Sequence, residues 1–182
     1  MNDKLGFELD RPIVMVGLMG AGKTSIGRML ARKLDIPFVD SDKEIESAAG
    51  CSVVDIFSLY GEEEFRRVEE RIISRLLSSP PALKVISTGE GAFITQSVRA
   101  LILKNATSVW LKADLDLLAK RTSFRDTRPQ LLNADSRKIL RTLIDERYKI
   151  YATADIVVET KDEVLAKTLG KVLTALKNFK KL

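Results

Sequence analysis

The eight residues from Gly17 to Thr24 constrain the fold of this chain more than any other segment. Their sequence, Gly-Leu-Met-Gly-Ala-Gly-Lys-Thr, matches the pattern G-x-x-x-x-G-K-[ST]. The apolar run 13–16 comes directly before them, and a segment of helical period, 24–34, follows. A strand, a glycine-rich loop and a helix in this order form the setting in which such a loop holds phosphate. The segment therefore predicts an α/β nucleotide-binding fold.

The glycine-rich loop also predicts which groups contact the phosphates. Glycines let the backbone curl so that its N–H groups face an anion, and the following helix directs its partial positive end to the same place. Lys23 is expected to reach the β- and γ-phosphates, and the Thr24 hydroxyl to bind Mg²⁺. The predicted nucleotide contacts are Gly20, Ala21, Gly22, Lys23, Thr24 and Ser25. NTPases, switches and kinases all use this motif, so it does not fix the reaction.

The rest of the chain continues the pattern that the loop begins. Short β-branched runs alternate with longer segments of helical period, as in βαβ units that build a parallel sheet covered by helices. Further strands are predicted at 37–40, 84–87, 108–111 and 155–158, and further helices at 96–104, 115–121 and 135–151, besides a long helix that ends before Pro80. We expect one domain over residues 1–182, with 1–11 as a loose extension.

The composition excludes several kinds of chemistry and several partners. The sequence has no histidine, which removes Ser-His-Asp catalysis and His-ligated zinc, and its one cysteine, Cys51, allows no intrachain disulfide. No apolar run approaches the roughly 18 residues of a membrane span, and no secretory signal is expected. The net charge of +5 is spread along the chain, and the basic cluster at Lys177, Lys180 and Lys181 is interpreted as a solvated tail. We predict a cytoplasmic protein with no nucleic-acid or membrane partner.

Two aspartates follow the second predicted strand. Asp40 and Asp42 are two residues apart at the carboxyl end of that strand, the edge at which open parallel sheets bind ligands. Asp40 is expected to hold Mg²⁺ through its water shell, and Asp42 to accept a hydrogen bond from an attacking hydroxyl. An alternative is that Asp42 caps a helix that begins near Lys43.

Several arginines occupy unusual places. Arg147 continues the apolar stripe of the helix at 135–151, and an unpaired guanidinium is costly to bury, so it must reach water or meet an anion. Arg66 follows Phe65 on the apolar face of the long helix, although a surface ion pair with Glu62 or Glu70 would also explain it. The unpatterned segment 123–135, with Arg121 just before it and Arg128 within it, is interpreted as a mobile lid that neutralises transition-state charge.

Taken together, these motifs resemble the shikimate kinase family from about Ile13 to about Val158. The resemblance rests on the glycine-rich loop, on Asp40-Ser41-Asp42 and on four further segments, which are Gly61 to Glu69, similar to the family's G-E-x-x-F-R-x-x-E, then Ser87 to Ala92, Arg128 to Leu132 and Glu146 to Tyr151. The combination is specific, whereas among the single motifs only the glycine-rich loop is.

The resemblance implies a P-loop NTPase-type three-layer fold, with a five-stranded parallel sheet, helices on both faces, a substrate-binding region at 43–75 and a lid at 123–135. It implies that ATP, with Mg²⁺, phosphorylates the 3-hydroxyl of shikimate in aromatic amino-acid biosynthesis, giving shikimate 3-phosphate and ADP. The implied catalytic residues are Lys23, Asp42 and Arg128, and Arg121 and Arg128 are implied nucleotide contacts. The implied shikimate ligands are Asp42, Arg66, Gly89, Gly91 and Arg147. A monomer is expected.

One position departs from the family pattern, because the family's glycine triplet is Gly89-Glu90-Gly91 here. Successive side chains alternate in an extended segment, so Glu90 is expected to project away from the acceptor pocket if the two glycines face it. Alternatively, an arginine neutralises Glu90, with Arg66 and Arg128 as the candidates. Two other functions remain open, a gluconate kinase-like enzyme and a nucleotide-binding regulator without catalysis.

Overall fold

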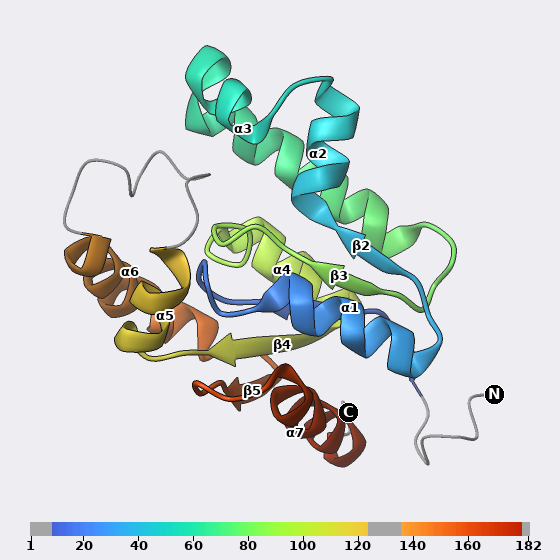
Figure 1. Cartoon of the computed structure of the whole chain (residues 1–182). Helices are drawn as coiled ribbons and strands as arrows, with labels where there is room; N and C mark the ends of the chain where they lie inside the picture. Colours follow the sequence, from blue (N-terminus) through green and yellow to red (C-terminus); the bar gives the residue numbers. More distant parts are fainter. Residues whose placement is uncertain (1–8, 124–135, 180–182) are drawn as a thin grey trace.

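The computed structural model describes residues 9–123 and 136–179. In these ranges the chain alternates strands and helices (Figure 1). The elements are β1 (Ile13–Val16), α1 (Lys23–Leu34), β2 (Phe38–Asp40), α2 (Ser41–Ala49), α3 (Val53–Ser78), β3 (Val85–Ser87), α4 (Gln96–Asn105), β4 (Thr107–Lys112), α5 (Leu115–Thr122), α6 (Ser136–Tyr151), β5 (Ile156–Glu159) and α7 (Leu165–Asn178).

The five strands form one parallel sheet in the order β2-β3-β1-β4-β5. The central strand β1 pairs with β3 and β4, so that Met15 lies between Ser87 and Val109. Because all strands run the same way, the segments that follow them meet at one edge of the sheet. The glycine-rich loop, Asp40 and the segment after Ser87 therefore come together although they are far apart in sequence.

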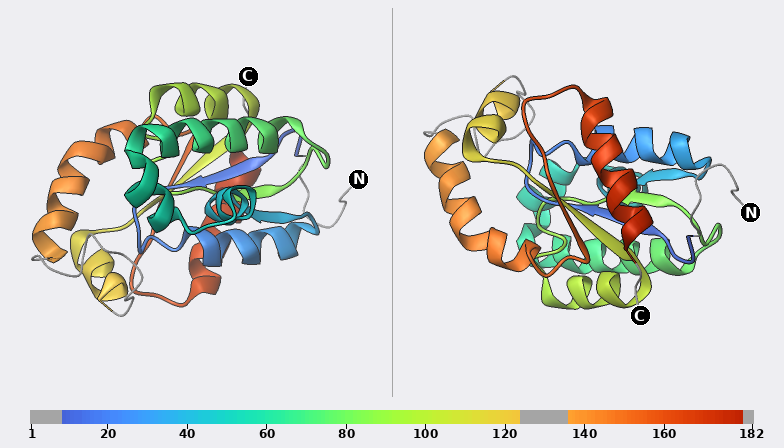
Figure 2. Two further views of the ribbon diagram at one scale, coloured as in Figure 1. Left: turned by 90° about the horizontal axis from the view of Figure 1, so that it is seen from above. Right: turned by 90° about the horizontal axis from the view of Figure 1, so that it is seen from below.

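Helices cover both faces of the sheet. In Figure 2, α1 and α7 lie on one face, and α3 and α4 lie on the other. All four residues of β1 are fully buried, as expected for a central strand of a parallel sheet with two covered faces. The predicted fold class is thus confirmed, and the strands and helices predicted with both bounds differ from the observed ones by at most one residue at either end.

The region above the sheet in Figure 1 consists of α2 and the amino-terminal half of α3. Ser52 caps α3 in a reciprocal arrangement with Asp55, and the helix is interrupted at Gly61, where φ is 80° and ψ is 173°. A residue with a Cβ is strained in that conformation, so glycine permits the kink. The substrate-binding role predicted for residues 43–75 remains a prediction.

The carboxyl-terminal helix α7 was not predicted from the sequence. Lys177 lies in its last turn, so the interpretation of the basic cluster as a tail is wrong for this residue, while Lys180 and Lys181 lie outside the described residues. Residues 124–135 of the predicted lid at 123–135, with Arg128, and residues 1–8 of the predicted extension also lie outside them. None of the helices over 9–123 and 136–179 is long and apolar enough to cross a membrane.

Candidate active site

The glycine-rich loop joins β1 to α1 and leaves the start of α1 open to an anion. The helix begins after Gly22, whose φ of 98° lies in the left-handed region, and no side chain caps its first turn. The first N–H groups of α1 and its partial positive charge therefore face the space above the sheet edge. A Cβ on Gly17 would lie 2.8 Å from the carbonyl oxygen of Leu111, so the loop also depends on a close backbone approach.

Lys23 lies across this loop rather than pointing into solvent. Its Nζ donates hydrogen bonds to the carbonyl oxygens of Gly17 at 2.7 Å and Leu18 at 3.0 Å, and the residue is buried. The loop therefore supplies its own anchor for the ammonium group. This places the one lysine of the motif beside the N–H groups that would surround a phosphate.

Three oxygen-bearing side chains meet beside the start of α1. The Thr24 hydroxyl donates to Asp40 Oδ2 at 3.2 Å and lies 3.3 Å from the Ser87 hydroxyl, so α1, β2 and β3 each deliver one residue. Hydroxyl and carboxylate oxygens suit Mg²⁺, which usually keeps several waters and takes other ligands from phosphates. The described residues contain no group of three or more Cys, Asp or Glu able to hold a metal by themselves. The chemistry of this corner fits a magnesium ion that is carried by a nucleotide.

The structure shows which aspartate caps the helix that follows β2. The helix α2 begins at Ser41, and Asp40 is its capping residue, because the Asp40 side chain accepts a hydrogen bond from the Asp42 N–H. Asp42 therefore does not cap the helix. Its carboxylate lies in the first turn of α2 beside the segment that follows β3, where an ideal Cβ on Gly89 would be 2.7 Å from Asp42 Oδ1.

Arg121 bridges two segments on the other side of the glycine-rich loop. Its guanidinium donates to the carbonyl oxygen of Gly20 and to that of Lys161, both at 3.3 Å. Lys161 follows β5, so this arginine links the phosphate-binding loop to the segment after β5. The nucleotide contact predicted for Arg121 remains a prediction.

Arg66 belongs to a charge cluster on α3. Its guanidinium donates to Glu62 at 3.1 Å and to Glu69 at 2.7 Å. The alternative of a surface pair thus holds for Glu62 but not for Glu70, which accepts a hydrogen bond from the Ser97 hydroxyl. Burial disfavours the charged form of Arg66, yet the attraction of Glu69 and Glu62 outweighs it and leaves the pKa of the guanidinium raised.

Glu69 is a buried carboxylate in this cluster, and no role was predicted for it from the sequence. Its side chain is fully buried, and within the described structure Oε1 has no hydrogen-bond partner while Oε2 accepts from Arg66. Burial raises the pKa of this carboxyl, and Arg66 offsets only part of the rise. The signal was present in the sequence, because Glu69 lies four residues after Phe65 and three before Ile72 on an apolar helix face.

Gly89 and Gly91 let two charged side chains approach the backbone. A Cβ on Gly89 would lie 2.7 Å from Asp42 Oδ1 and 3.2 Å from Glu69 Oε1, and a Cβ on Gly91 would overlap the guanidinium of Arg66. Both contacts are possible only because these residues lack a side chain. The segment 89–91 therefore brings Asp42 and Arg66 to a single place above β3.

Arg147 reaches the same segment from α6. Its Nη1 lies 3.6 Å from Glu90 Oε1, and the Tyr151 hydroxyl, one turn further along α6, donates to the carbonyl oxygen of Glu90. Glu90 thus does not project away from the predicted acceptor residues. Glu90 does have an arginine partner, as the alternative expects, but that partner is Arg147. Arg66 pairs with Glu62 and Glu69 instead. Arg128 lies outside the described residues.

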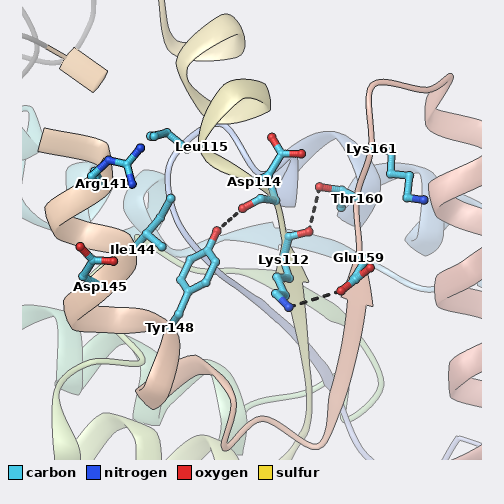
Figure 3. Close-up of a pocket in the computed structure, with 11 residues that line it drawn as sticks. Lys112, Asp114, Leu115, Arg141, Ile144, Asp145, Tyr148, Glu159, Thr160 and Lys161 are labelled. Carbon is cyan, nitrogen blue, oxygen red and sulfur yellow. Dashed lines mark hydrogen bonds and ion pairs between the residues drawn. The ribbon is translucent and has the colours of Figure 1, made fainter. Parts of the chain in front are cut away.

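A cavity lined by α6 and by the segments that follow β4 and β5 is separate from these residues. Its volume is about 430 Å³, and it lies between α6 and the carboxyl ends of β4 and β5 (Figure 3). Positive and negative side chains alternate around it, and the Tyr148 hydroxyl closes one side by donating to the Ala113 carbonyl oxygen. Lys23, Asp42, Arg66 and Arg147 do not line this cavity. The candidate site is therefore identified by its convergent charges and not by the depth of a pocket.

Comparison with known proteins identifies the family of this chain. The family model "Shikimate kinase" matches residues 19–177. A shikimate kinase of Paramagnetospirillum magneticum is 50% identical over 172 residues, which cover 94% of this chain and 87% of the relative. A shikimate kinase of Mesorhizobium japonicum is 50% identical over 166 residues, which cover 91% of this chain and 81% of the relative.

Solved structures lead to the same family. A shikimate kinase from Acinetobacter baumannii in complex with shikimate superposes with a TM-score of 0.87 at 33% identity, covering 97% of both chains. A gluconokinase from Sinorhizobium meliloti superposes with a TM-score of 0.61 at 19% identity, covering 93% of both chains, which shows a shared fold alone. By its sequence and by its structure, this chain belongs to the shikimate kinase family.

Proposed function

We propose that this protein transfers the γ-phosphoryl group of ATP to the 3-hydroxyl of shikimate, producing shikimate 3-phosphate and ADP for aromatic amino-acid biosynthesis. The observation that carries the proposal is the convergence of Asp42, Arg66 and Arg147 on the segment 89–91, beside the phosphate-binding loop. Two guanidinium groups and one carboxylate at such a place suit an acceptor that has both a carboxylate and a hydroxyl. The match to shikimate kinases supports shikimate as that acceptor.

The two arginines are proposed to bind the carboxylate of the acceptor. Arg147 Nη1 is buried and makes no hydrogen bond in the described structure, so it has donor capacity for an incoming anion. Glu69 and Glu62 hold the guanidinium of Arg66 against Gly91 and limit the orientations that it can adopt. With Gly89 and Gly91 leaving room at the backbone, the acceptor would be fixed by its carboxylate at one end.

Asp42 is proposed to act at the other end of the acceptor. Its carboxylate would accept a hydrogen bond from the 3-hydroxyl and take the proton as the hydroxyl oxygen attacks the γ-phosphorus of ATP. The bond between the γ-phosphorus and the bridging oxygen of ADP breaks in the same displacement. Lys23 would leave its two loop carbonyls and neutralise charge on the phosphates, and Arg121 and Arg128 would contact the nucleotide and the transferring group.

Thr24 directly, and Asp40 through water, are the residues proposed to hold a nucleotide-bound Mg²⁺. A magnesium ion held there would supply positive charge that offsets the negative charge of the phosphates. The hydrogen bond from the Asp42 N–H keeps the Asp40 carboxylate next to the Thr24 hydroxyl. The chain's own contribution is thus the orientation of two oxygen ligands.

The proposed function is tested by ADP release from ATP with four acceptor conditions: shikimate, gluconate, AMP and no acceptor. We expect ADP release that depends on shikimate. Faster release with gluconate or AMP would replace the acceptor assignment. ADP release that is the same under all four conditions, or none under any, would contradict the function.

The proposal includes a monomer in the cytoplasm, where ATP is available. Light scattering coupled to size exclusion is expected to give a mass near 20.3 kDa for the chain. A mass of about twice that value would contradict the monomer.

A further inference from the structure

Glu90 is a carboxylate placed within the proposed acceptor subsite. Its side chain is only 14% exposed, and the Arg147 side chain, 3.6 Å away, is 21% exposed. A carboxylate so far removed from water needs a positive partner. Arg147 supplies that charge from α6, an element distant from Glu90 in sequence.

The main chain of Glu90 is fixed to the same helix. The Tyr151 hydroxyl donates to the Glu90 carbonyl oxygen, and the Tyr151 side chain is fully buried against Phe93 and Trp110. Burial, with the Glu90 charge as a further cause, raises the pKa of the tyrosine, so the hydroxyl stays protonated and able to donate. Two residues of α6 thus hold Glu90, because Arg147 pairs with its side chain and Tyr151 binds its carbonyl oxygen.

The ion pair leaves a guanidinium donor available. The Nη1–Oε1 separation of 3.6 Å exceeds a normal hydrogen bond, and Nη1 makes no hydrogen bond in the described part of the chain. Glu90 therefore offsets the charge of Arg147 without using the hydrogen-bond capacity of that nitrogen. A second carboxylate can approach Arg147, but it meets the negative charge of Glu90 nearby.

We propose that Glu90 determines specificity in the acceptor subsite by competing with the acceptor's carboxylate for Arg147. The inference rests on the proposed function, because it takes Arg147 as a ligand of that carboxylate. Two carboxylates around one guanidinium repel each other, so either Glu90 turns away or both share the positive charge. In each case a carboxylate acceptor gains less from Arg147 than it would beside a neutral residue. A neutral acceptor of the same shape loses nothing in this way.

The test compares shikimate with its neutral methyl ester in the full-length protein. KM and kcat are measured for both acceptors in the wild type, in Glu90→Gln and in Glu146→Gln, a control that removes an exposed charge next to Arg147 on α6. Glu90→Gln is expected to lower the KM of shikimate by about three- to fivefold, the upper part of the range for one partly screened charge, and to leave that of the ester within about twofold. The control is expected to leave both within about twofold.

A second readout follows acceptor binding without ATP. Trp110 is the only tryptophan, and its ring stacks on Tyr151 at a centroid distance of 5.8 Å, so its fluorescence can report the dissociation constants of both acceptors. These constants are expected to follow the KM values. Glu90→Gly repeats the comparison without an amide that could itself contact Arg147, and thermal unfolding verifies that each variant is folded.

The outcomes separate this inference from the function on which it rests. If shikimate is turned over but both variants at position 90 leave the ratio of the two acceptors unchanged, the inference is overturned and the function stands. If Glu90→Gln raises the KM of shikimate, Glu90 positions Arg147 instead of competing for it, and the inference is also overturned. A folded wild-type protein inert toward shikimate would contradict the proposed function, and the inference would fall with it.

Discussion

The phosphate-binding side and the proposed acceptor side of this protein hold their charged side chains in place in different ways. On the phosphate-binding side, Lys23 is held by carbonyl oxygens of its own loop, all within one continuous segment. On the acceptor side, Asp42, Arg66 and Arg147 come from three helices and meet only in the folded chain. Glu69 Oε1 and Arg147 Nη1 remain buried there without hydrogen-bond partners in the described structure.

The two sides are therefore prepared for binding to different degrees. The phosphate-binding loop satisfies its lysine before any ligand arrives, so binding exchanges one set of hydrogen bonds for another. The acceptor side keeps buried polar atoms whose hydrogen bonds a ligand could complete, and such atoms cost about 1 to 3 kcal/mol each while unpaired. Substitutions on the first side should therefore change turnover most, and those on the acceptor side should divide between turnover and acceptor affinity.

The largest effect is expected for Lys23→Ala. Turnover should fall by about a thousandfold or more, because a positioned positive charge on the transferring phosphates is lost, while the fold remains intact. Steady-state ADP release and thermal unfolding provide the measurements, and Lys33→Ala, an exposed lysine at the end of the same helix, is the matched control. Normal turnover in a folded Lys23→Ala variant would remove the phosphate-binding assignment.

Asp42→Asn is expected to have the next largest effect. It should lower turnover by at least about a hundredfold, the lower range for a positioned base, and keep nucleotide affinity. Since Asp40 and not Asp42 caps α2, the change should cost little stability. Turnover within a fewfold of the wild type would show that this carboxylate does not take part in the transfer.

Arg147→Ala tests the predicted contact between Arg147 and the carboxylate of the acceptor. A charge-assisted contact with a carboxylate is worth about 1.5 to 3 kcal/mol, so the KM of the acceptor should rise more than tenfold while that of ATP changes little. Arg141→Ala, an exposed arginine on the same helix, serves as the control. An unchanged acceptor KM with unchanged stability would exclude Arg147 from the site.

The smallest effect concerns the pH dependence of stability. Burial raises the pKa of Glu69 in the folded state above its ordinary value of 4.5, so the folded chain binds this proton more tightly than the unfolded chain. The contribution is fully present below pH 4.5 and is lost as the pH rises through the folded pKa. The unfolding free energy of the wild type, relative to Glu69→Gln, should therefore fall above pH 4.5.

Urea unfolding at a series of pH values measures this difference. Glu63→Gln, which changes an exposed carboxylate on the same helix, should give a profile parallel to the wild type. A parallel profile for Glu69→Gln as well would show that the buried carboxyl binds its proton equally in both states.

The same contrast explains what could be predicted from the sequence. The strands and the glycine-rich loop are local patterns, so the fold class and the place of Lys23 follow from periodicity and one motif. The helix α7 is not among the predicted elements, although its apolar residues keep helical spacing at Leu165, Leu169, Val172 and Leu176. The basic residues at its end favoured the interpretation of this segment as a solvated tail.

The acceptor side could be predicted only in part. Arg147 could be predicted because it is a charged residue on the apolar stripe of a helix. Glu69 is also a charged residue on an apolar helix face, but no role is predicted for it from the sequence. The partner of Glu90 could not be found, since its pairing with Arg147 depends on how α6 packs against the segment after β3, a contact between distant parts of the chain. The roles of all these residues remain predictions until they are measured.

The independence of the two sides is tested most directly by calorimetric binding of shikimate to Lys23→Ala in the absence of nucleotide. The proposed acceptor ligands come from α2, α3, α6 and the segment 89–91, none of which holds Lys23. We therefore expect a dissociation constant within about threefold of the wild-type value, a difference below 1 kcal/mol. Loss of shikimate binding in this variant, with the fold intact, would contradict the division of the site into two separately assembled sides.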